Sequence, residues 1–391
     1  MMRRGCRVSS TLQQLLCHQS RALWSVRRGT ASSWTAATKS LSGSRRGLLG
    51  LAEASSSSLE KSSAAAAALD SDEAAEDSPF SSTYSASFDA LRTVETGKPQ
   101  LTLRRPVTRA GVGLHSGEVA ELRLLPAAAG NGRYFVVGNE NFRIPAMLDY
   151  VRDTVLNTCL GRGNLSIRTV EHLLSALEGL GVDNCRIEIR NGREVPVLDG
   201  SALEWVKAIE HSGLSVAEDG EGSPILRRKI VLTEPLSVLH GDSFVAGFPA
   251  SNTRLTYGID FSQVQAIRQQ WFTWSPDDST SYSKEVAPAR TFGIYEQINQ
   301  LQAAGLIKGG SLENALVCSM ENGWLNPPLR FSNEPCRHKL LDLIGDLALC
   351  AYKGHPGLPV AHIIAYKASH ALHVKFGEAI LQAGVKQLLS M

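Results

Sequence analysis

The sequence lacks several features that would place the protein in a specialised class. It contains no run of 18 apolar residues, so the pattern predicts no membrane-spanning helix. Its seven cysteines are scattered without CxxC spacing. This argues against a disulfide framework or a zinc knuckle and is compatible with a reducing compartment. What is present, 43% hydrophobic and 20% charged residues in a chain of 391, is typical of a globular protein with two domains.

Acidic residues are absent from the first 52 positions, which hold eight arginines and one lysine among many serines. The rest of the chain is therefore net acidic despite a formal charge of +2. A basic, acid-free segment without a compact apolar core is typical of an organellar transit peptide rather than a secretory signal. The alternative is a basic tail that binds nucleic acid. We favour a transit peptide, expect no nucleic-acid partner, and predict the mitochondrion, with the plastid as the alternative.

Large apolar residues are scarce in residues 53–97, which include the stretch ASSSSLEKSSAAAAALDSDEAAEDS. Such a composition cannot bury a core and predicts a low-complexity linker. The folded part should then start near Gln100. We expect a first domain over residues 98–222 and a second over residues 223–391, because the acidic, glycine-rich AEDGEGSP separates them.

Strand and helix patterns alternate from Leu101 onward. Two strands flank GVGLHSG, and the runs NCRIEIRNG and REVPVLDG are rich in strand-forming residues. An amphipathic helix is predicted from Glu171 to about Leu180, with Thr169 as a possible N-cap, and a further helix near Ser201. Glu171 and His172 open the first helix, where two titratable side chains could simply be solvated.

One helical spacing, HxLxxLxG, occurs twice. It is formed by His172, Leu174, Leu177 and Gly179, and again by His338, Leu340, Leu343 and Gly345. Leucines three apart share one helical face, so each helix would pack its leucines inward and present a histidine. The repeat suggests two similar domains that each bring one helix to a common centre.

The second of these helices, RHKLLDLIGDLALC, carries a row of polar residues. His338 and Asp342 are four apart and Asp346 continues the row, which suits chelation of one ion. Hydrogen bonding on a solvated face is the alternative. The apolar surroundings favour burial, and a buried charge needs a partner or a metal. A later stretch, VAHIIAYKASHALHVKF, predicts a buried strand and then a helix. Its candidates for function are His362, Lys367, His370 and His373.

Six motifs in this order resemble the UDP-3-O-acyl-N-acetylglucosamine deacetylases, the zinc amidases of lipid A synthesis. They are TVEHLLSALEGLGVDN, EVPVLDGSA, ARTFG, GGSLENAL, RHKLLDLIGDL and AYKASHAL. The similarity runs from about Leu101 to Leu381. It implies an α+β fold of two domains with related topology, each a β-sheet layered against helices, with helices sandwiched at the interface and the site at their junction.

The resemblance also implies a catalytic metal centre. Its ligands would be His172, His338 and Asp342, holding Zn²⁺, or Fe²⁺, which the same donor set accepts. Glu171 would be the general base that takes a proton from the attacking water. His370, held by Asp346, would stabilise the oxyanion and protonate the leaving amine.

Substrate contacts follow from the same resemblance. Thr291 would lie near the oxyanion and Phe292 beside the sugar and acyl chain. Two lysines, Lys339 and Lys367, would meet the nucleotide diphosphate. The pocket would be lined by His115 and Cys159.

Residues 293–329 resemble an insert that forms an apolar passage for the fatty acyl group. Lys308 stands there where the family usually has an apolar residue, which bears on the preferred chain length. Ser369 replaces a glycine just before His370, and serine resists backbone angles that glycine adopts easily.

The implied reaction is hydrolysis of the N-acetyl group of UDP-3-O-acyl-N-acetylglucosamine, which releases acetate. Two alternatives stay open: a metal-dependent amidase for another acetylated sugar, and a noncatalytic zinc-structured binding protein. The latter would close the fourth coordination position and would have no use for Glu171 or His370. We expect the sugar nucleotide as the partner and favour a monomer.

Targeting can be tested apart from catalysis. Fusing residues 1–97 to a fluorescent reporter should direct it to an organelle, the mitochondrion first, because this segment carries the predicted transit peptide and linker. Fluorescence microscopy with organelle markers measures the outcome. A reporter that stays diffuse in the cytosol would contradict the transit-peptide interpretation.

Overall fold

The computed structural model describes residues 91–138, 142–276, 281–326 and 328–389. The predicted transit peptide, residues 1–52, and most of the predicted linker, residues 53–97, lie outside these ranges. Strand β1 (Thr93–Pro99) nevertheless begins inside that linker and pairs antiparallel with β12 (Leu226–Ile230). Regular structure therefore starts before Gln100, where the sequence placed the beginning of the folded part.

Two five-stranded sheets have the same connectivity. The first has the order β3-β4-β10-β5-β6 and the second β13-β14-β20-β15-β16. In each sheet the central strand is parallel to one neighbour and every other pairing is antiparallel. The strands of the first are β3 (Val107–Val112), β4 (Val119–Pro126), β5 (Arg133–Val137), β6 (Arg143–Pro145) and β10 (Cys185–Ile189). Those of the second are β13 (Leu236–His240), β14 (Ser243–Pro249), β15 (Arg254–Phe261), β16 (Arg268–Trp274) and β20 (Ala361–Tyr366).

Each half also carries a three-stranded insert between its fourth sheet strand and the helix that follows. The first insert contains η1 (Leu148–Tyr150), β7 (Val151–Asp153), β8 (Cys159–Arg162) and β9 (Leu165–Ile167). The second contains α5 (Tyr282–Glu285), β17 (Phe292–Ile294), α6 (Tyr295–Ala303), β18 (Leu316–Ser319) and β19 (Gly323–Trp324). A further pair joins β2 (Leu101–Leu103) to β11 (Leu214–Val216). The related topology predicted for the two halves is present, in an α+β fold.

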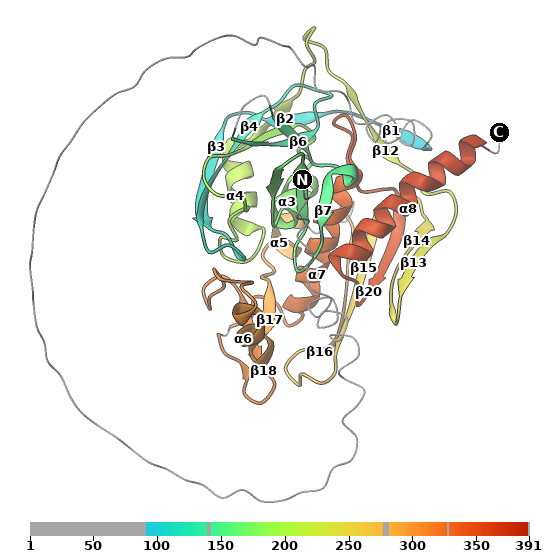
Figure 1. The fold of residues 1–391 in the computed structure, drawn as a ribbon. Helices are drawn as coiled ribbons and strands as arrows, with labels where there is room; N and C mark the ends of the chain where they lie inside the picture. Colours follow the sequence, from blue (N-terminus) through green and yellow to red (C-terminus); the bar gives the residue numbers. More distant parts are fainter. Residues whose placement is uncertain (1–90, 139–141, 277–280, 327, 390–391) are drawn as a thin grey trace, which may run out of the picture. The chain divides into compact units, whose positions relative to one another are not determined.

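Helices α3 (Glu171–Gly179) and α7 (Glu334–Leu347) follow the inserts and lead into the central strands β10 and β20. They run side by side (Figure 1). Each half ends its pattern with another helix, α4 (Leu203–Ser212) or α8 (His370–Leu389), and η2 (Ala348–Cys350) extends α7. No helix in the described ranges is long and apolar enough to cross a membrane.

Both central helices are buried on all sides. In α3 every residue from Glu171 to Glu178 is buried, and in α7 twelve of its fourteen residues are. The four repeated leucines, Leu174, Leu177, Leu340 and Leu343, have no exposed surface, as their spacing predicted. The prediction of an amphipathic first helix was wrong, because α7 covers the side of α3 that would otherwise face water.

Two local predictions also differ from the structure. Val170, not Thr169, is the N-cap of α3, and no side chain caps the helix. Thr169 instead has a φ of 57° and donates its hydroxyl to Glu194 Oε1 at 2.8 Å. The REVPVLDG run forms isolated bridges rather than a strand, since its residues contact separate segments.

The two central helices are in tight contact at Gly345, the last residue of the second HxLxxLxG spacing. A Cβ atom there would collide with the backbone carbonyl of Glu171. The absence of a side chain on α7 therefore lets the first turn of α3, which carries Glu171 and His172, lie directly against it.

Gly345→Ala should separate the two helices. Overpacking of this kind costs about 1–3 kcal/mol, so we expect a lower free energy of unfolding and weaker metal binding. Denaturant unfolding and a chelator competition measure the two effects. Gly220→Ala is the matched control, because a Cβ there meets nothing within 4 Å. Equal behaviour of the two variants would contradict the role assigned to Gly345.

Candidate active site

Three helices bring the predicted polar residues together. Glu171 and His172 lie at the start of α3, while His338, Asp342 and Asp346 follow one another along α7. The start of α8 adds His370 and His373. All seven side chains are buried. The bland interpretations of solvated helix positions are therefore wrong.

A first cluster consists of His172, His338 and Asp342. The Nε2 atoms of His172 and His338 lie 3.6 Å and 3.4 Å from the same carboxylate oxygen, Asp342 Oδ1. The two imidazole rings meet edge to face with centroids 4.9 Å apart. Tetrahedral zinc with bonds of about 2.0–2.2 Å would hold neighbouring ligand atoms about 3.3 Å apart. The three atoms thus have the spacing of metal ligands.

The hydrogen bonds around this cluster support the same interpretation. Asp342 Oδ1 is buried without a hydrogen-bond partner, which is costly unless something else binds it. Ala289 O lies 3.0 Å from His338 Nδ1, so that nitrogen donates and Nε2 presents its lone pair toward Asp342. Burial lowers the pKa of His338 to about 3, so the ring is neutral, as a metal ligand must be. These residues could hold a divalent cation.

Glu171 lies beside this cluster without being part of it. Its Oε2 accepts a hydrogen bond from the backbone N–H of Thr158 at 3.0 Å. Burial raises the pKa of Glu171 above its ordinary value. The side chain is therefore a stronger base than a solvated glutamate, which suits proton transfer.

A second cluster centres on Asp346. Its Oδ2 lies 2.7 Å from the Nδ1 atoms of both His370 and His373, and Thr158 Oγ1 donates to its Oδ1 at 2.5 Å. These are hydrogen-bond lengths, shorter than the spacing of tetrahedral metal ligands. This second group of two histidines and a carboxylate is thus a hydrogen-bonded network rather than a metal site.

His370 is the positively charged member of this network. Although burial opposes the charge, the carboxylate of Asp346 raises the pKa of His370 to about 9. The pKa of Asp346 falls to about 2, since His370 and the hydrogen bonds to it outweigh the effect of burial. The pair is a carboxylate with an imidazolium at neutral pH.

Ser369, where the resemblance implies a glycine, is accommodated without strain. The residues of this turn with a positive φ include Lys367, at 52°, but not Ser369. The carbonyl of Ser369 accepts the N–H groups of Leu372 and His373 at 2.9 Å and so starts α8. His370 is therefore held in place by a normal helix start.

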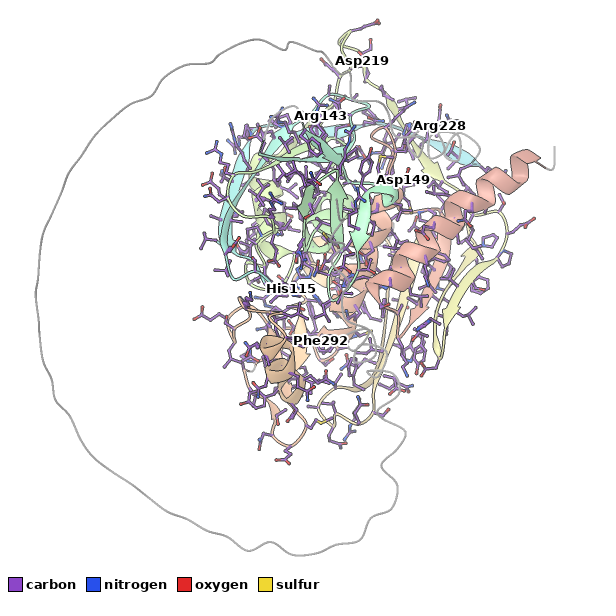
Figure 2. All side chains as sticks on the ribbon, viewed as in Figure 1. His115, Arg143, Asp149, Asp219, Arg228 and Phe292 are labelled. Atoms are coloured by element: carbon purple, nitrogen blue, oxygen red, sulfur yellow. The ribbon has the colours of Figure 1, made fainter. Side chains whose placement is uncertain are left out.

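The residues expected around the substrate lie on segments that border the two clusters. Thr291 follows the loop whose Ala289 carbonyl contacts His338, and its own backbone bonds to Gly200 and Leu316. Phe292 begins β17 (Figure 2). Its ring packs edge-on against that of Phe261.

His115 lies in the loop between β3 and β4 (Figure 2). Cys159 begins β8. Both are buried, and neither ring nitrogen of His115 has a hydrogen-bond partner. Burial lowers the pKa of His115 and raises that of Cys159.

The two lysines expected near a diphosphate have carboxylate partners in the structure. Lys339 Nζ lies 2.9 Å from Asp342 Oδ2, and Lys367 pairs with Asp242. Lys308, in the second insert, is exposed, and its N–H lies 3.4 Å from the carbonyl of His115.

Two residues that hold the site's side chains in place, Glu334 and Thr158, were not predicted from the sequence. Glu334 has no exposed surface and accepts hydrogen bonds from the backbone and guanidinium of Arg290, next to the Ala289 carbonyl that holds His338. The sequence could have indicated Glu334, because it lies four residues before His338 and so on the same face of α7. Thr158 offered no such indication, because it is 188 residues from Asp346.

The site contains two imidazoles and a carboxylate that converge on one point, which is a donor set typical of metal-dependent hydrolases. A second carboxylate and a charged histidine lie beside it, as in the active sites of such enzymes. The family model of the UDP-3-O-acyl N-acetylglycosamine deacetylases (LpxC) matches residues 100–382. The chain belongs to this family of metal-dependent deacetylases.

Curated relatives agree. The probable UDP-3-O-acyl-N-acetylglucosamine deacetylase 1, mitochondrial, of Arabidopsis thaliana is 51% identical over 287 residues, which cover 71% of this chain and 86% of that protein. The UDP-3-O-acyl-N-acetylglucosamine deacetylase of Trichormus variabilis is 53% identical over 286 residues, 72% of this chain and 98% of that protein.

The metal content of two variants distinguishes the predicted roles of Glu171 and His172 at the start of α3. His172→Ala removes one converging nitrogen, so the purified protein should lose most of its bound metal. Glu171→Gln leaves the three atoms in place and should retain near-normal metal. Inductively coupled plasma mass spectrometry after gel filtration measures both. Equal metal in the two variants would contradict the ligand assignment.

Proposed function

We propose that the protein hydrolyses the N-acetyl group of a UDP-3-O-acyl-N-acetylglucosamine in a zinc-dependent reaction, releasing acetate and the free amine. The observation that carries this proposal is the unpartnered Asp342 Oδ1 facing two imidazole nitrogens, with a buried glutamate next to them. A binding protein with structural zinc would have no use for that glutamate or for a charged His370. The pathway would be the synthesis of a lipid A precursor.

The metal would be held by His172, His338 and Asp342. When bound, Zn²⁺ supplies a Lewis acid that polarises the amide carbonyl and makes water more acidic. Fe²⁺ suits the same donors. The Ala289 carbonyl keeps His338 in the tautomer that such a ligand needs.

Glu171 would accept the proton of the attacking water. Its buried carboxylate has a raised pKa, so it holds that proton better than a solvated glutamate would. The N–H of Thr158 fixes one of its oxygens and leaves the other for the water. General base catalysis of this kind is typically worth about 10²–10⁴-fold.

His370 would stabilise the negative charge that develops on the carbonyl oxygen and then protonate the leaving amine. Its Nδ1 is engaged by Asp346, which leaves Nε2 as the nitrogen that can serve the substrate. Because Asp346 keeps the ring charged at neutral pH, the proton is in place before the reaction begins. Thr291 would lie near the same oxygen.

An acylated substrate is supported by the surface of the second insert. Helix α6 buries no side chain, and the insert exposes large apolar residues, namely Tyr295, Leu312, Met320 and Leu325. Apolar surface of this kind suits a fatty acyl chain, for which each buried methylene contributes about 0.8 kcal/mol. Phe292 would border this passage, with His115 and Cys159 as pocket lining. Lys339 and Lys367 would bind the diphosphate of the substrate. Each ammonium group would then leave its present carboxylate partner and contact a phosphate instead.

The names of the Arabidopsis relatives and the acid-free first 52 residues support mitochondrial import. The plastid is the alternative destination.

Acetate release from purified, zinc-loaded protein tests the function. UDP-3-O-acyl-N-acetylglucosamine should be the preferred substrate, and removal of its acyl chain should cost at least about 10²-fold in kcat/KM, given the methylenes that lose burial. Preference for a simple N-acetylated sugar would favour the alternative of another amidase. Absence of hydrolysis with every substrate would favour the binding protein.

The proposed roles of the base and the acid predict different pH profiles. Since the pKa of His370 is raised to about 9, the acid is present below that pH, and kcat/KM should fall as the pH rises through about 9. His370→Gln should remove this alkaline limb, and Glu171→Gln should lower turnover by about 10²–10⁴-fold with the metal retained. Full turnover by Glu171→Gln would refute the mechanism.

A further inference from the structure

The carboxylate of Asp346 contacts two histidines, whereas the sequence analysis predicted a contact with His370 alone. The Nδ1 atoms of His370 and His373 both lie 2.7 Å from its Oδ2. The two residues are one helical turn apart on α8, so their side chains reach α7 from the same face. His373 is 1% exposed, and its ring meets that of His370 edge to face with centroids 6.0 Å apart.

The single negative charge of Asp346 can neutralise one imidazolium. The groups that face His370 are Glu171 on α3, Asp342 and Asp346 on α7, His373 on α8 and His115 in the β3–β4 loop. Three of these are carboxylates, which favour a charged ring. His373 faces Asp346, Asp342 and the ring of Tyr257, and burial lowers the pKa of His373 in spite of the two carboxylates. His370 therefore holds the charge and His373 is neutral.

The contact with Asp346 fixes the tautomer of the neutral His373 ring. An ionised carboxylate only accepts hydrogen bonds, so Nδ1 of the neutral ring must donate to Asp346. Nε2 of the neutral ring then carries the lone pair, and it lies 3.1 Å from the hydroxyl oxygen of Tyr257. Burial raises the pKa of Tyr257 well above its usual value, so the phenol keeps its single proton. The hydroxyl donates that proton to the carbonyl of Ala368 at 2.8 Å, in the turn before His370.

We propose that His373 is a positioning residue for His370: it holds the Asp346 carboxylate in place and divides its negative charge between two imidazoles, so that His370 gives up its proton more readily. This inference rests on the proposed function, in which His370 is the acid. A carboxylate that served His370 alone would stabilise the imidazolium more strongly and make it a weaker acid toward the leaving amine.

The test compares His373→Leu, which removes the donor, with His373→Asn, whose side-chain amide can still donate to Asp346. The full zinc-loaded chain, labelled with ¹³C at histidine Cε1, is titrated by nuclear magnetic resonance. In His373→Leu the midpoint of the His370 signal should rise by about one pH unit. The alkaline limb of kcat/KM should move by the same amount, and kcat at neutral pH should fall by roughly three- to tenfold.

The asparagine variant should keep the His370 midpoint within about half a unit of the parent value. His373→Met is a second donor-free variant for the case that leucine prevents folding, because methionine adapts to irregular space. An unchanged midpoint in the donor-free variant would overturn the inference. So would an equal shift in His373→Asn, because lost packing rather than a lost donor would then be the cause.

The two readouts distinguish this inference from the proposed function. A midpoint and an alkaline limb that shift together support both. A midpoint that rises while the limb stays in place supports the shared carboxylate and contradicts the role of His370 as the acid.

Discussion

The contact of α3 with α7 at Gly345 is the constraint on which the site depends. One helix belongs to each half of the molecule, and neither half holds a complete set of polar groups. A side chain at position 345 would collide with the backbone of Glu171. The two helices can therefore pack this closely only because residue 345 is a glycine. That approach sets His172 Nε2 3.6 Å from Asp342 Oδ1.

Burial gives these groups their chemistry. In water, a histidine at a helix start and a carboxylate one turn further on would be ordinary solvated residues. Enclosed between two sheets, His338 stays neutral and Glu171 becomes more basic, while Asp346 keeps His370 charged. The fold would thus provide the neutral ligand, the base and the acid of the proposed mechanism from neighbouring buried side chains.

Much of this arrangement could be predicted from the sequence, for reasons that are local. The spacing of His338, Asp342 and Asp346 places them on one face of a helix, and the repeated HxLxxLxG predicted two related halves. The amphipathic pattern expected for α3 failed because periodicity cannot show what covers the second face. Thr158 and Tyr257 were missed because their partners, Asp346 and His373, are more than 100 residues away. The start of the folded part was misplaced because β1 contains one large apolar residue, Val94, and so gives no apolar strand pattern.

The central claim is that one metal ion is bound by residues from both halves. X-ray absorption spectroscopy at the zinc edge of the zinc-loaded protein tests this most directly. The account predicts a first shell of nitrogen and oxygen at about 2.0–2.2 Å with two imidazoles and no sulfur, and one imidazole fewer in His172→Ala. A sulfur ligand at about 2.3 Å, or two imidazoles that persist in His172→Ala, would contradict it.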